Sequence, residues 1–373
     1  MKQGWEIKNI EECLEKVVYT NKIQRKDFLE DGEYPVISQE QDFINGYWNN
    51  SDDLYKIKKP VVIFGDHTQI IKFVDFDFVL GADGVKILQP KDSIEPRYFY
   101  YFLQNINLGN LGYARHYRLL KEINIQYPNS LPEQHRIVSI LDEAFAVIER
   151  SRNAAIQNLK NTKELFDSYL QSVFTNKGEG WEEKTLNQIS DNLDSKRVPI
   201  TKNIRKEGSI PYYGASGIVD YVADYLFDED LLCVSEDGAN LLARTYPIAF
   251  SITGKTWVNN HAHILRFKNI TTQKFVELYL NSIKLDDFIS GMAQPKLNQS
   301  MLNKIPIPFP TLTQQQTIVK KFDALSTETK QLESIYQKKI TDLEELKKSI
   351  LQKAFTGGLN YDSSDFYDSN EKN

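Results

Sequence analysis

The chain has few of the residues and segments that define several common protein classes. Its two cysteines, Cys13 and Cys233, are too few and too far apart for a disulfide framework. No run of 18 uncharged apolar residues occurs, and the start, MKQGWEIKNIEE, lacks the apolar core of a signal peptide. The net charge of -6 argues against indiscriminate coating of nucleic acid or anionic membrane. At 373 residues we therefore expect a soluble cytoplasmic protein of two to three domains, away from the membrane, in which any contact with DNA would be local.

Catalytic motifs are equally scarce. No Gly-x-Gly-x-x-Gly occurs, and the segment 254–256, Gly-Lys-Thr, resembles the end of a phosphate loop whose required first glycine is replaced by Ala249. His261 and His263 lack a third partner at metal-ligand spacing, so we expect no metal site. His263 alternates with apolar neighbours in an expected strand and is interpreted as structural. The sequence therefore favours a binding protein over an enzyme.

Two alternatives stay open at this point. The adjacent pair Asp66 and His67 allows a nuclease or hydrolase that works with a divalent metal. The long helices described next also allow a purely structural coiled-coil scaffold.

The sequence repeats itself at an offset of 181 residues. LPEQHRIVSILD at 131–142 returns as LTQQQTIVKKFD at 312–323, and 159–175 returns as 340–356. Twelve identities over 45 ungapped positions compare with roughly three expected from ordinary composition. GWEIK at 4–8 and YPVISQEQDFINGY at 34–47 also have weaker counterparts, GWEEK at 180–184 and IPYYGASGIVDY at 210–221. Duplication explains this order of segments.

Each repeat joins a globular part to a helix. The first part is rich in Tyr, Phe and Gly, with short β-like runs such as PVVIFG, whereas no Gly or Pro lies between Glu133 and Lys177. Capping boxes at Ser130–Glu133 and Thr311–Gln314 start the two helices. We predict an α+β fold in which two similar mixed α/β domains are separated by two long antiparallel coiled-coil helices, as a pseudo-two-fold repeat. The expected segments are domains at 1–130 and 178–310, helices at 131–177 and 311–358, and a disordered acidic tail at 359–373.

The apolar positions of both helices are spaced near 3.5 residues, as in Ile137, Leu141, Ala144 and Ile148, which predicts a seam for another helix. The other interpretation is that each helix lies on its own domain. About 44 residues span roughly 66 Å, more than a domain with a radius of gyration near 14 Å offers, so we expect the two helices to pair.

Basic residues recur before the same aromatic and glycine elements of both repeats. A second cluster combines arginine, histidine, amide and lysine groups, which can pair with base edges. The alternatives are a solvated charged loop for the first set and a packed surface for the second. The candidate DNA contacts are Lys22, Arg25, Lys26, Lys196, Arg197, Lys202, Arg205 and Lys206 for phosphates, and Arg115, His116, Tyr117, Arg118, Gln294 and Lys296 for bases.

The combination resembles a known family. FGDHTQIIKFVDFDFVLGADGVKIL, PYYGASGIVDYV and the LPEQ and LTQQQ helix openings, in this repeated order, resemble the specificity subunit of type I restriction-modification enzymes over residues 1 to about 358. The resemblance implies two target-recognition domains, each recognising half of an asymmetric bipartite site in double-stranded DNA, with helices that set the spacing. His67 joins the candidate DNA contacts on this basis.

The resemblance also implies partners. Methylation and cleavage would belong to two modification subunits and to restriction subunits, which would carry S-adenosylmethionine, ATP and Mg, so that this chain is a non-catalytic subunit without a cofactor of its own. Residues off the helix seam repeat at the same offset and are predicted to dock the modification subunits, although they could instead cap the domains. They are Leu165, Leu170, Phe174, Leu346, Leu351 and Phe355.

Overall fold

The chain forms two compact units. The computed structural model describes residues 3–82, 84–109, 112, 114–291 and 293–359. Unit 1 comprises Met1–Ala155 with Lys338–Asn373, and unit 2 comprises Ile156–Gln337. Each unit therefore combines one globular domain with half of each long helix, whereas the sequence interpretation treats the helices as separate segments.

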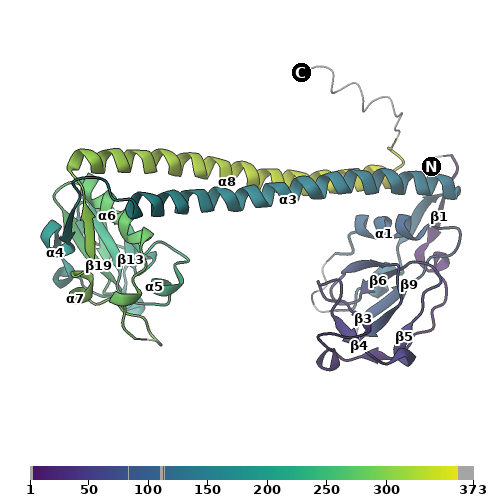
Figure 1. Ribbon diagram of the computed structural model, residues 1–373. Helices are drawn as coiled ribbons and strands as arrows, with labels where there is room; N and C mark the ends of the chain where they lie inside the picture. Colours follow the sequence, from purple (N-terminus) through teal and green to yellow (C-terminus); the bar gives the residue numbers. More distant parts are fainter. Residues whose placement is uncertain (1–2, 83, 110–111, 113, 292, 360–373) are drawn as a thin grey trace, which may run out of the picture. The chain divides into compact units, whose positions relative to one another are not determined.

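Unit 1 contains ten strands among its described residues, and α1 lies beside them (Figure 1). The strands are β1 (Trp5–Asn9), β2 (Lys22–Ile23), β3 (Tyr34–Ile37), β4 (Gly46–Trp48), β5 (Leu54–Tyr55), β6 (Val61–Gly65), β7 (Ile71–Val74), β8 (Phe78–Gly81), β9 (Val85–Leu88) and β10 (Asn124–Pro128). The helices are α1 (Pro96–Asn105), α2 (Tyr117–Leu120) and the 3-10 turns η1 (Ile10–Cys13), η2 (Arg25–Asp27) and η3 (Ser51–Asp53).

Unit 2 repeats this composition. Its strands are β11 (Glu182–Thr185), β12 (Ser190–Asn192), β13 (Glu207–Gly214), β14 (Gly217–Val222), β15 (Phe227–Asp228), β16 (Leu231–Ser235), β17 (Ala249–Ile252), β18 (Lys255–Val258), β19 (Ala262–Phe267) and β20 (Pro306–Phe309). Its helices are α4 (Leu186–Ile189), α5 (Asn240–Ala243), α6 (Ile270–Ser282), α7 (Gln299–Leu302), η4 (Asp194–Lys196), η5 (Lys202–Ile204) and η6 (Asp286–Phe288).

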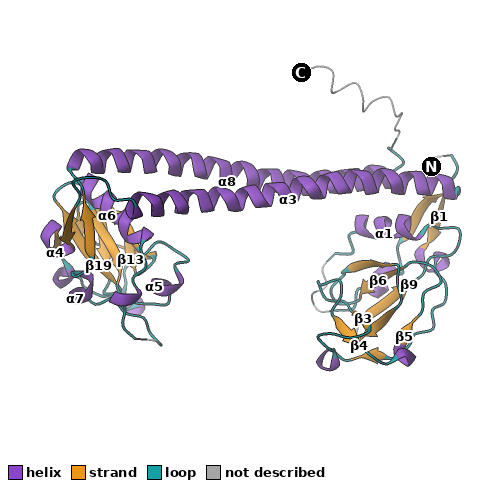
Figure 2. Cartoon of the chain, viewed as in Figure 1, coloured by secondary structure: helices purple, strands orange, loops and turns teal. Residues whose placement is uncertain are grey.

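The two units share one strand topology, which confirms the predicted pair of similar α/β domains. In unit 1 the order β7-β6-β9 is antiparallel, and β8 pairs parallel with β3 and antiparallel with β5. In unit 2, β17-β16-β19 is antiparallel, and β18 pairs parallel with β13 and antiparallel with β15. Each unit closes with an antiparallel pair, β1-β10 or β11-β20, that leads directly into a long helix. In Figure 2 a helix lies beside the strands of each unit, α1 in unit 1 and α6 in unit 2.

The two long helices are α3 (Leu131–Thr175) and α8 (Leu312–Phe355). Within unit 1 they run antiparallel, because Phe145 of α3 lies under the ammonium of Lys347 at 5.0 Å while Arg152 lies 3.5 Å from Glu344. Within unit 2 the ring of Phe322 contacts those of Phe166 and Tyr169. The predicted seam positions Ile137, Leu141 and Ile148 are buried in unit 1. Contacts between α3 and α8 in both units confirm helix pairing inside each unit.

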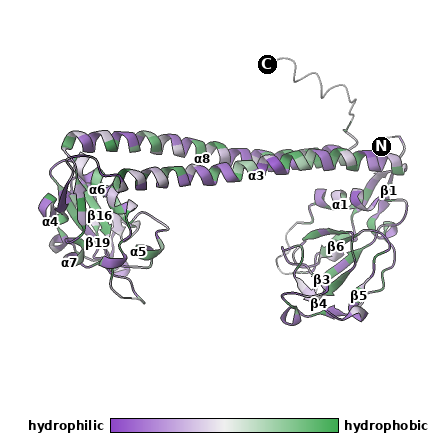
Figure 3. Cartoon of the chain, viewed as in Figure 1, coloured by the Kyte–Doolittle hydropathy of each residue, from purple (hydrophilic) through white to green (hydrophobic). Residues whose placement is uncertain are grey.

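The helices also complete the hydrophobic core of each domain. Val62, Tyr98 and Phe102 of unit 1 share a core with Leu351 and Phe355 of α8. In unit 2 the core that holds Phe275 and Leu280 takes Leu170 and Phe174 from α3. In Figure 3 the strands inside each unit are coloured hydrophobic, whereas many turns of α3 and α8 carry a hydrophilic stripe. Each helix is therefore both a partner of the other and a part of the domain core.

Two further findings concern the chain's end and the membrane. Leu359 is buried in the core of unit 1 and its carbonyl accepts a bond from Arg136, so the prediction that the tail begins at 359 is wrong by at least one residue. The rest of that predicted tail, 360–373, lies outside the described residues. Among the described residues, no helix combines the length and the apolar content needed to cross a bilayer.

Candidate nucleic-acid interface

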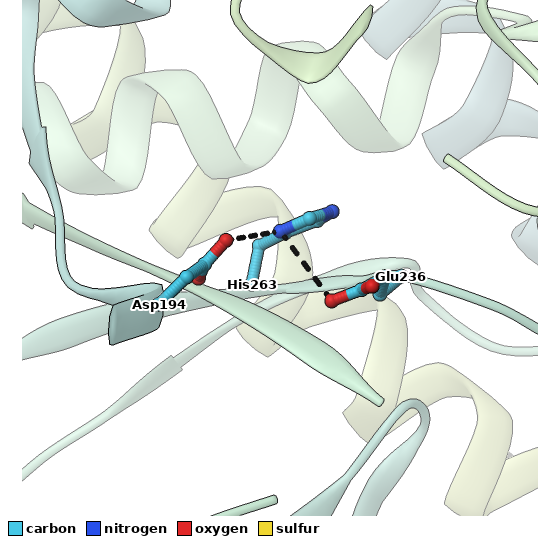
Figure 4. Close-up of side chains that lie close together, drawn as sticks. All are labelled: Asp194, Glu236 and His263. Atoms are coloured by element: carbon cyan, nitrogen blue, oxygen red, sulfur yellow. Dashed lines mark hydrogen bonds and ion pairs between the residues drawn. The ribbon is translucent and has the colours of Figure 1, made fainter. Parts of the chain in front are cut away.

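A cluster of charged and polar side chains lies inside unit 2, where β16 ends and β19 begins. His263 of β19 is 1% exposed, and its Nδ1 lies 2.6 Å from Asp194 Oδ2 and 3.7 Å from Glu236 Oε2 (Figure 4). The Arg197 guanidinium donates to Glu236 Oε2 at 2.6 Å and lies 3.6 Å from Asp194. Lys296 reaches the other oxygen of Glu236 at 3.2 Å. Two cationic side chains, Arg197 and Lys296, and the imidazole of His263 thus surround two carboxylates.

The environment favours the ionised form of both acids. Burial alone would raise the pKa of the Asp194 carboxyl, but the hydrogen bond and charge of His263 outweigh it and hold that pKa below its usual range. Burial also acts to raise the pKa of Glu236, and the bond from Arg197 with the charge of His263 lowers it overall. Asp194, Glu236 and His263 lie close enough together to suggest metal ligands, but Arg197 and Lys296 already pair with the carboxylates. The arrangement is an ion-pair network.

The network supports the segment 293–297, which we call the unit 2 loop. Lys296 of this loop exchanges two backbone bonds with Ser290, at 2.9 and 2.8 Å. The Leu297 amide donates to the Glu236 carbonyl at 2.8 Å, and the Gly238 amide donates to the Pro295 carbonyl at 3.0 Å. Pro295 and Leu297 are buried, whereas Gln294 and Lys296 are exposed. The loop therefore presents two polar side chains from an anchored backbone.

Unit 1 holds its corresponding segment by one matching backbone bond. Asp66 follows β6 as Glu236 follows β16, and its carbonyl accepts from the His116 amide at 2.7 Å, as that of Glu236 accepts from Leu297. The Asp66 carboxylate, 2% exposed, also accepts from the Tyr117 amide at 2.7 Å. These bonds match His116 with Leu297. Alignment of GYARHYR at 112–118 with GMAQPK at 291–296 in the sequence predicts instead that His116 corresponds to Pro295, which is wrong by two residues. The exposed Arg115 corresponds to Lys296.

The predicted DNA contacts divide into two groups. Those with exposed side chains remain predictions as phosphate or base contacts, and they are Lys22, Arg25, Lys26, Arg115, Arg118, Lys196, Lys202, Lys206, Gln294 and Lys296. His67 and Tyr117 are partly buried. Within the first group, Lys22 already donates to the Val85 carbonyl at 3.0 Å, and Arg25 lies 3.6 Å from Glu40.

Three predicted contacts are corrected. The His116 side chain is 1% exposed and its Nδ1 faces the Asp66 carbonyl at 3.1 Å, so it cannot present an edge to a base. Arg197 is bound inside the ion-pair network, which rules out a phosphate role for its guanidinium. Arg205 donates to Asp220 at 2.8 Å and stacks over the Tyr212 ring, so its charge is already partnered.

The predicted docking residues divide in the same way. Leu165 is 60% exposed and Leu346 is 47% exposed, and their docking role remains a prediction. The other four are buried in the cores of their own units, so the prediction that they form an exposed docking stripe is wrong. Phe174 packs against Phe275 and Tyr279, and Phe355 against Tyr98 and Phe102, while Leu170 and Leu351 join the same two cores.

Sequence reasoning missed Asp194 and Glu236 as partners of His263. Asp194 lies 69 residues and Glu236 27 residues before His263 in the chain, so no local spacing could connect them. The usable signal was the repeat: Asp66 and Glu236 occupy the same position after matched strands, and both are acidic.

A family model and two similar proteins all indicate the same family for this chain. A model described as the type I restriction modification DNA specificity domain matches residues 2–158 and again residues 178–342. A putative type I restriction enzyme specificity subunit of Haemophilus influenzae, S.HindORF215P, is 34% identical over 171 residues, which cover 46% of this chain and only 42% of that protein. The EcoR124I/EcoR124II specificity subunit of Escherichia coli is 26% identical over 341 residues, 82% of this chain and 83% of that one.

Solved structures share the fold. A chain from a study of complex assembly and conformational transition of the type I R-M system has a TM-score of 0.72 at 16% identity, covering 96% of this chain and 99% of that one. The HsdS subunit from Thermoanaerobacter tengcongensis has a TM-score of 0.56 at 17% identity, covering 96% and 98%. With two matches to one family model over most of its length, this chain belongs to the type I restriction-modification DNA specificity family, as a specificity subunit with two copies of the domain.

Proposed function

We propose that this chain recognises an asymmetric bipartite site in double-stranded DNA, with one half-site bound by each repeat domain. The observation that carries the proposal is the pair of matched loops. Each is fixed by the same backbone bond to the residue after a buried strand, Asp66 or Glu236, yet the exposed side chains differ. A common support with different polar groups suits two recognition surfaces with different base preferences.

Phosphate contacts are part of this proposal. The exposed lysines Lys196, Lys202 and Lys206 lie on or near the short turns η4 and η5 of unit 2, and Lys26 lies in η2 of unit 1. Such contacts fix the register of a protein on the duplex without specifying bases. Because the whole chain carries a net charge of -6, we expect the partner subunits to supply much of the phosphate affinity.

Partners and a location are also part of the proposal, and membership of the family supports them. Two modification subunits would dock on the helices, restriction subunits would join them, and S-adenosylmethionine, ATP and Mg would bind to those partners while this chain stays non-catalytic. The nuclease alternative loses support because the Asp66 carboxylate is buried and engaged by the Tyr117 amide, with Lys86 at 4.0 Å. Cytoplasmic action is also part of the proposal, and both cysteines are buried and unpaired.

The test is methylome sequencing of a host that carries this chain with its modification subunit. We expect one methylated motif with two unequal half-sites and a fixed gap. Replacing residues 1–130 with a homologous domain of different specificity should change one half-site and leave the other intact. If both halves change, independent recognition by the two domains is the wrong model. Cleavage of DNA by the purified chain with divalent metal would instead favour the nuclease.

A further inference from the structure

We propose that His263 is a positioning residue for base recognition in unit 2, which holds the unit 2 loop in register through the Leu297 carbonyl. This inference rests on the proposed function, since it assumes that the loop contacts DNA. His263 does not reach DNA itself, because its side chain is 1% exposed.

The imidazole joins three distant parts of the chain. It stands on β19, its Nδ1 contacts Asp194 of η4 at 2.6 Å, and its Nε2 contacts the Leu297 carbonyl at 2.7 Å. Asp194 is itself fixed, because its second oxygen accepts from the Ile264 amide at 2.8 Å. The ring is thus a rigid link between the central sheet and the end of the loop.

Both ring nitrogens face oxygens that only accept hydrogen bonds, a carboxylate and a carbonyl. A neutral imidazole has a single N–H, so making both bonds requires a ring that donates from Nδ1 and from Nε2. The charged groups around it are Asp194 and Glu236 on one side and Arg197 and Lys296 beside them.

The loop's contacts explain how the link affects recognition. The bonds at Pro295, Lys296 and Leu297 fix three successive residues of the unit 2 loop. The exposed Gln294 comes directly before them. Leu297 is fully buried, so losing the donor from His263 leaves its carbonyl inside the domain without that bond. A shift at Leu297 would move the amide of Gln294 relative to a base edge, and base-edge hydrogen bonds depend on this placement.

The matching position in unit 1 supports a role for His263 in positioning the unit 2 loop. On β9 of unit 1, Lys86 pairs with Phe64, and on β19 His263 pairs with Val234, which is the same position in the matched strands. The Lys86 ammonium lies 4.0 Å from Asp66 and 5.3 Å from the centre of the Tyr117 ring. Both domains therefore place a basic side chain next to the acidic residue that anchors the candidate recognition segment.

Two substitutions separate the two bonds of the ring. His263→Asn places an amide nitrogen near the position of Nδ1 and loses the donor to Leu297, whereas His263→Gln places one near Nε2 and keeps it. The full chain is co-expressed with its modification subunit, and methylation is measured at sites with one mismatch in either half. We expect His263→Asn to raise methylation of second-half mismatches about tenfold relative to the matched site, with first-half mismatches unchanged. His263→Gln should restore discrimination, and His135→Asn, at an exposed histidine of α3, should leave it intact.

The possible outcomes distinguish a failure of the proposed function from a failure of the inference about His263. A wild-type complex without a bipartite motif would overturn the proposed function and this inference together. A normal wild-type motif with unchanged second-half discrimination in His263→Asn, or equal relaxation of both halves, overturns the inference alone. Since a buried substitution can prevent folding, ¹⁵N spectra of histidine-labelled wild-type chain give a second measurement. Protons on both ring nitrogens of His263 are expected, and a bare Nε2 refutes the link to Leu297.

Discussion

Gln134 and Gln315, 181 residues apart in the sequence, make the same hydrogen bond at the start of the two long helices. Each side-chain amide is at most 1% exposed and donates to the carbonyl of a proline before the helix, Pro128 at 2.8 Å and Pro310 at 2.9 Å. Each also accepts a bond from its own domain, from the Glu95 amide or the Thr272 hydroxyl. The two glutamines thus fasten helix to domain in both repeats.

Replacing either glutamine should destabilise its own unit. Gln134→Ala leaves buried groups without partners and should lower the free energy of unfolding by about 3 kcal/mol, and Gln315→Ala by about 2 kcal/mol. Hydrogen exchange of the full chain should place the first effect in unit 1 and the second in unit 2. Gln157→Ala, at an exposed position of α3, is the control and should change little. Equal effects in both units from one substitution would contradict the assignment.

The exposed lysines of unit 2 should govern the salt dependence of DNA binding. Lys202→Ala combined with Lys206→Ala should reduce the slope of log affinity against log salt by about two, with the preferred bases unchanged. Arg197→Ala should behave differently, because it leaves Glu236 and Asp194 buried with one cation fewer and so destabilises unit 2. A salt slope unchanged by the double substitution would show that these lysines are a solvated loop.

Helix length should set the gap between half-sites. Four residues inserted both after Ile156 and after Gln337 add about 6 Å to each helix, or one to two base pairs at about 3.4 Å per pair. Both points lie at the boundary between the two compact units. The methylated motif of an active variant should have a gap longer by that amount, and insertion in one helix alone should abolish activity because the seams lose register. An unchanged gap rules out the helices as a spacer.

Leu165 and Leu346 should matter for the modification subunits. Leu165→Asp with Leu346→Asp should leave a folded chain that no longer co-purifies with its methyltransferase, since both side chains are exposed and repeat at the same offset. Val147→Asp with Ile335→Asp is a matched control, because at the offset of 181 these exposed apolar residues correspond to Glu328 and to the small Ala154, so neither repeats as a large apolar side chain. If the first variant still co-purifies with its partner, docking occurs elsewhere.

Stability should respond to pH through Lys72 of unit 1. Its ammonium is 4% exposed and is bound by the Phe43 carbonyl at 3.3 Å and by Asn45 Oδ1 at 3.0 Å, and burial lowers its pKa from 10.5 to about 8. Between these values the unfolded chain keeps the proton that the folded chain loses, so stability rises with pH. Relative to Lys72→Met, the wild-type chain should gain up to about 3 kcal/mol between pH 8 and 10.5 in urea unfolding. Lys16→Met, at an exposed lysine, should show the wild-type pH profile, and a flat difference for Lys72→Met would refute the assignment.

The sequence was most informative where periodicity and repetition acted together. The helix starts at Leu131 and Leu312 follow from capping residues and from the absence of Gly and Pro, because these are local properties. The exposure of single charged side chains was harder to predict. Arg197 and Lys196 are adjacent and equally basic, yet only Arg197 faces two carboxylates, one of them 39 residues away in the chain. Such pairing depends on strand order, which composition does not encode.

The prediction of docking residues was wrong at four positions for a related reason. A repeated apolar residue on a helix can face a partner protein or its own domain, and both choices give the same offset in the sequence. Phe174 and Phe355 face α6 and α1, whereas Leu165 and Leu346 remain exposed. Distinguishing the two requires knowing which side of the helix the domain covers.

The packing of Phe355 against Tyr98 and Phe102 has a consequence for synthesis. Unit 1 is discontinuous, since it needs residues after Lys338 to finish its core, whereas unit 2 is one continuous stretch. At about 5–20 residues per second, the ribosome needs roughly 10–40 s to travel from the end of the first part to Phe355. During that interval unit 2 can complete its core, whereas Tyr98 and Phe102 still lack their contact with Phe355. The domain that is translated first is therefore the last to mature, and chaperone protection is needed most at the α1 surface of the nascent chain.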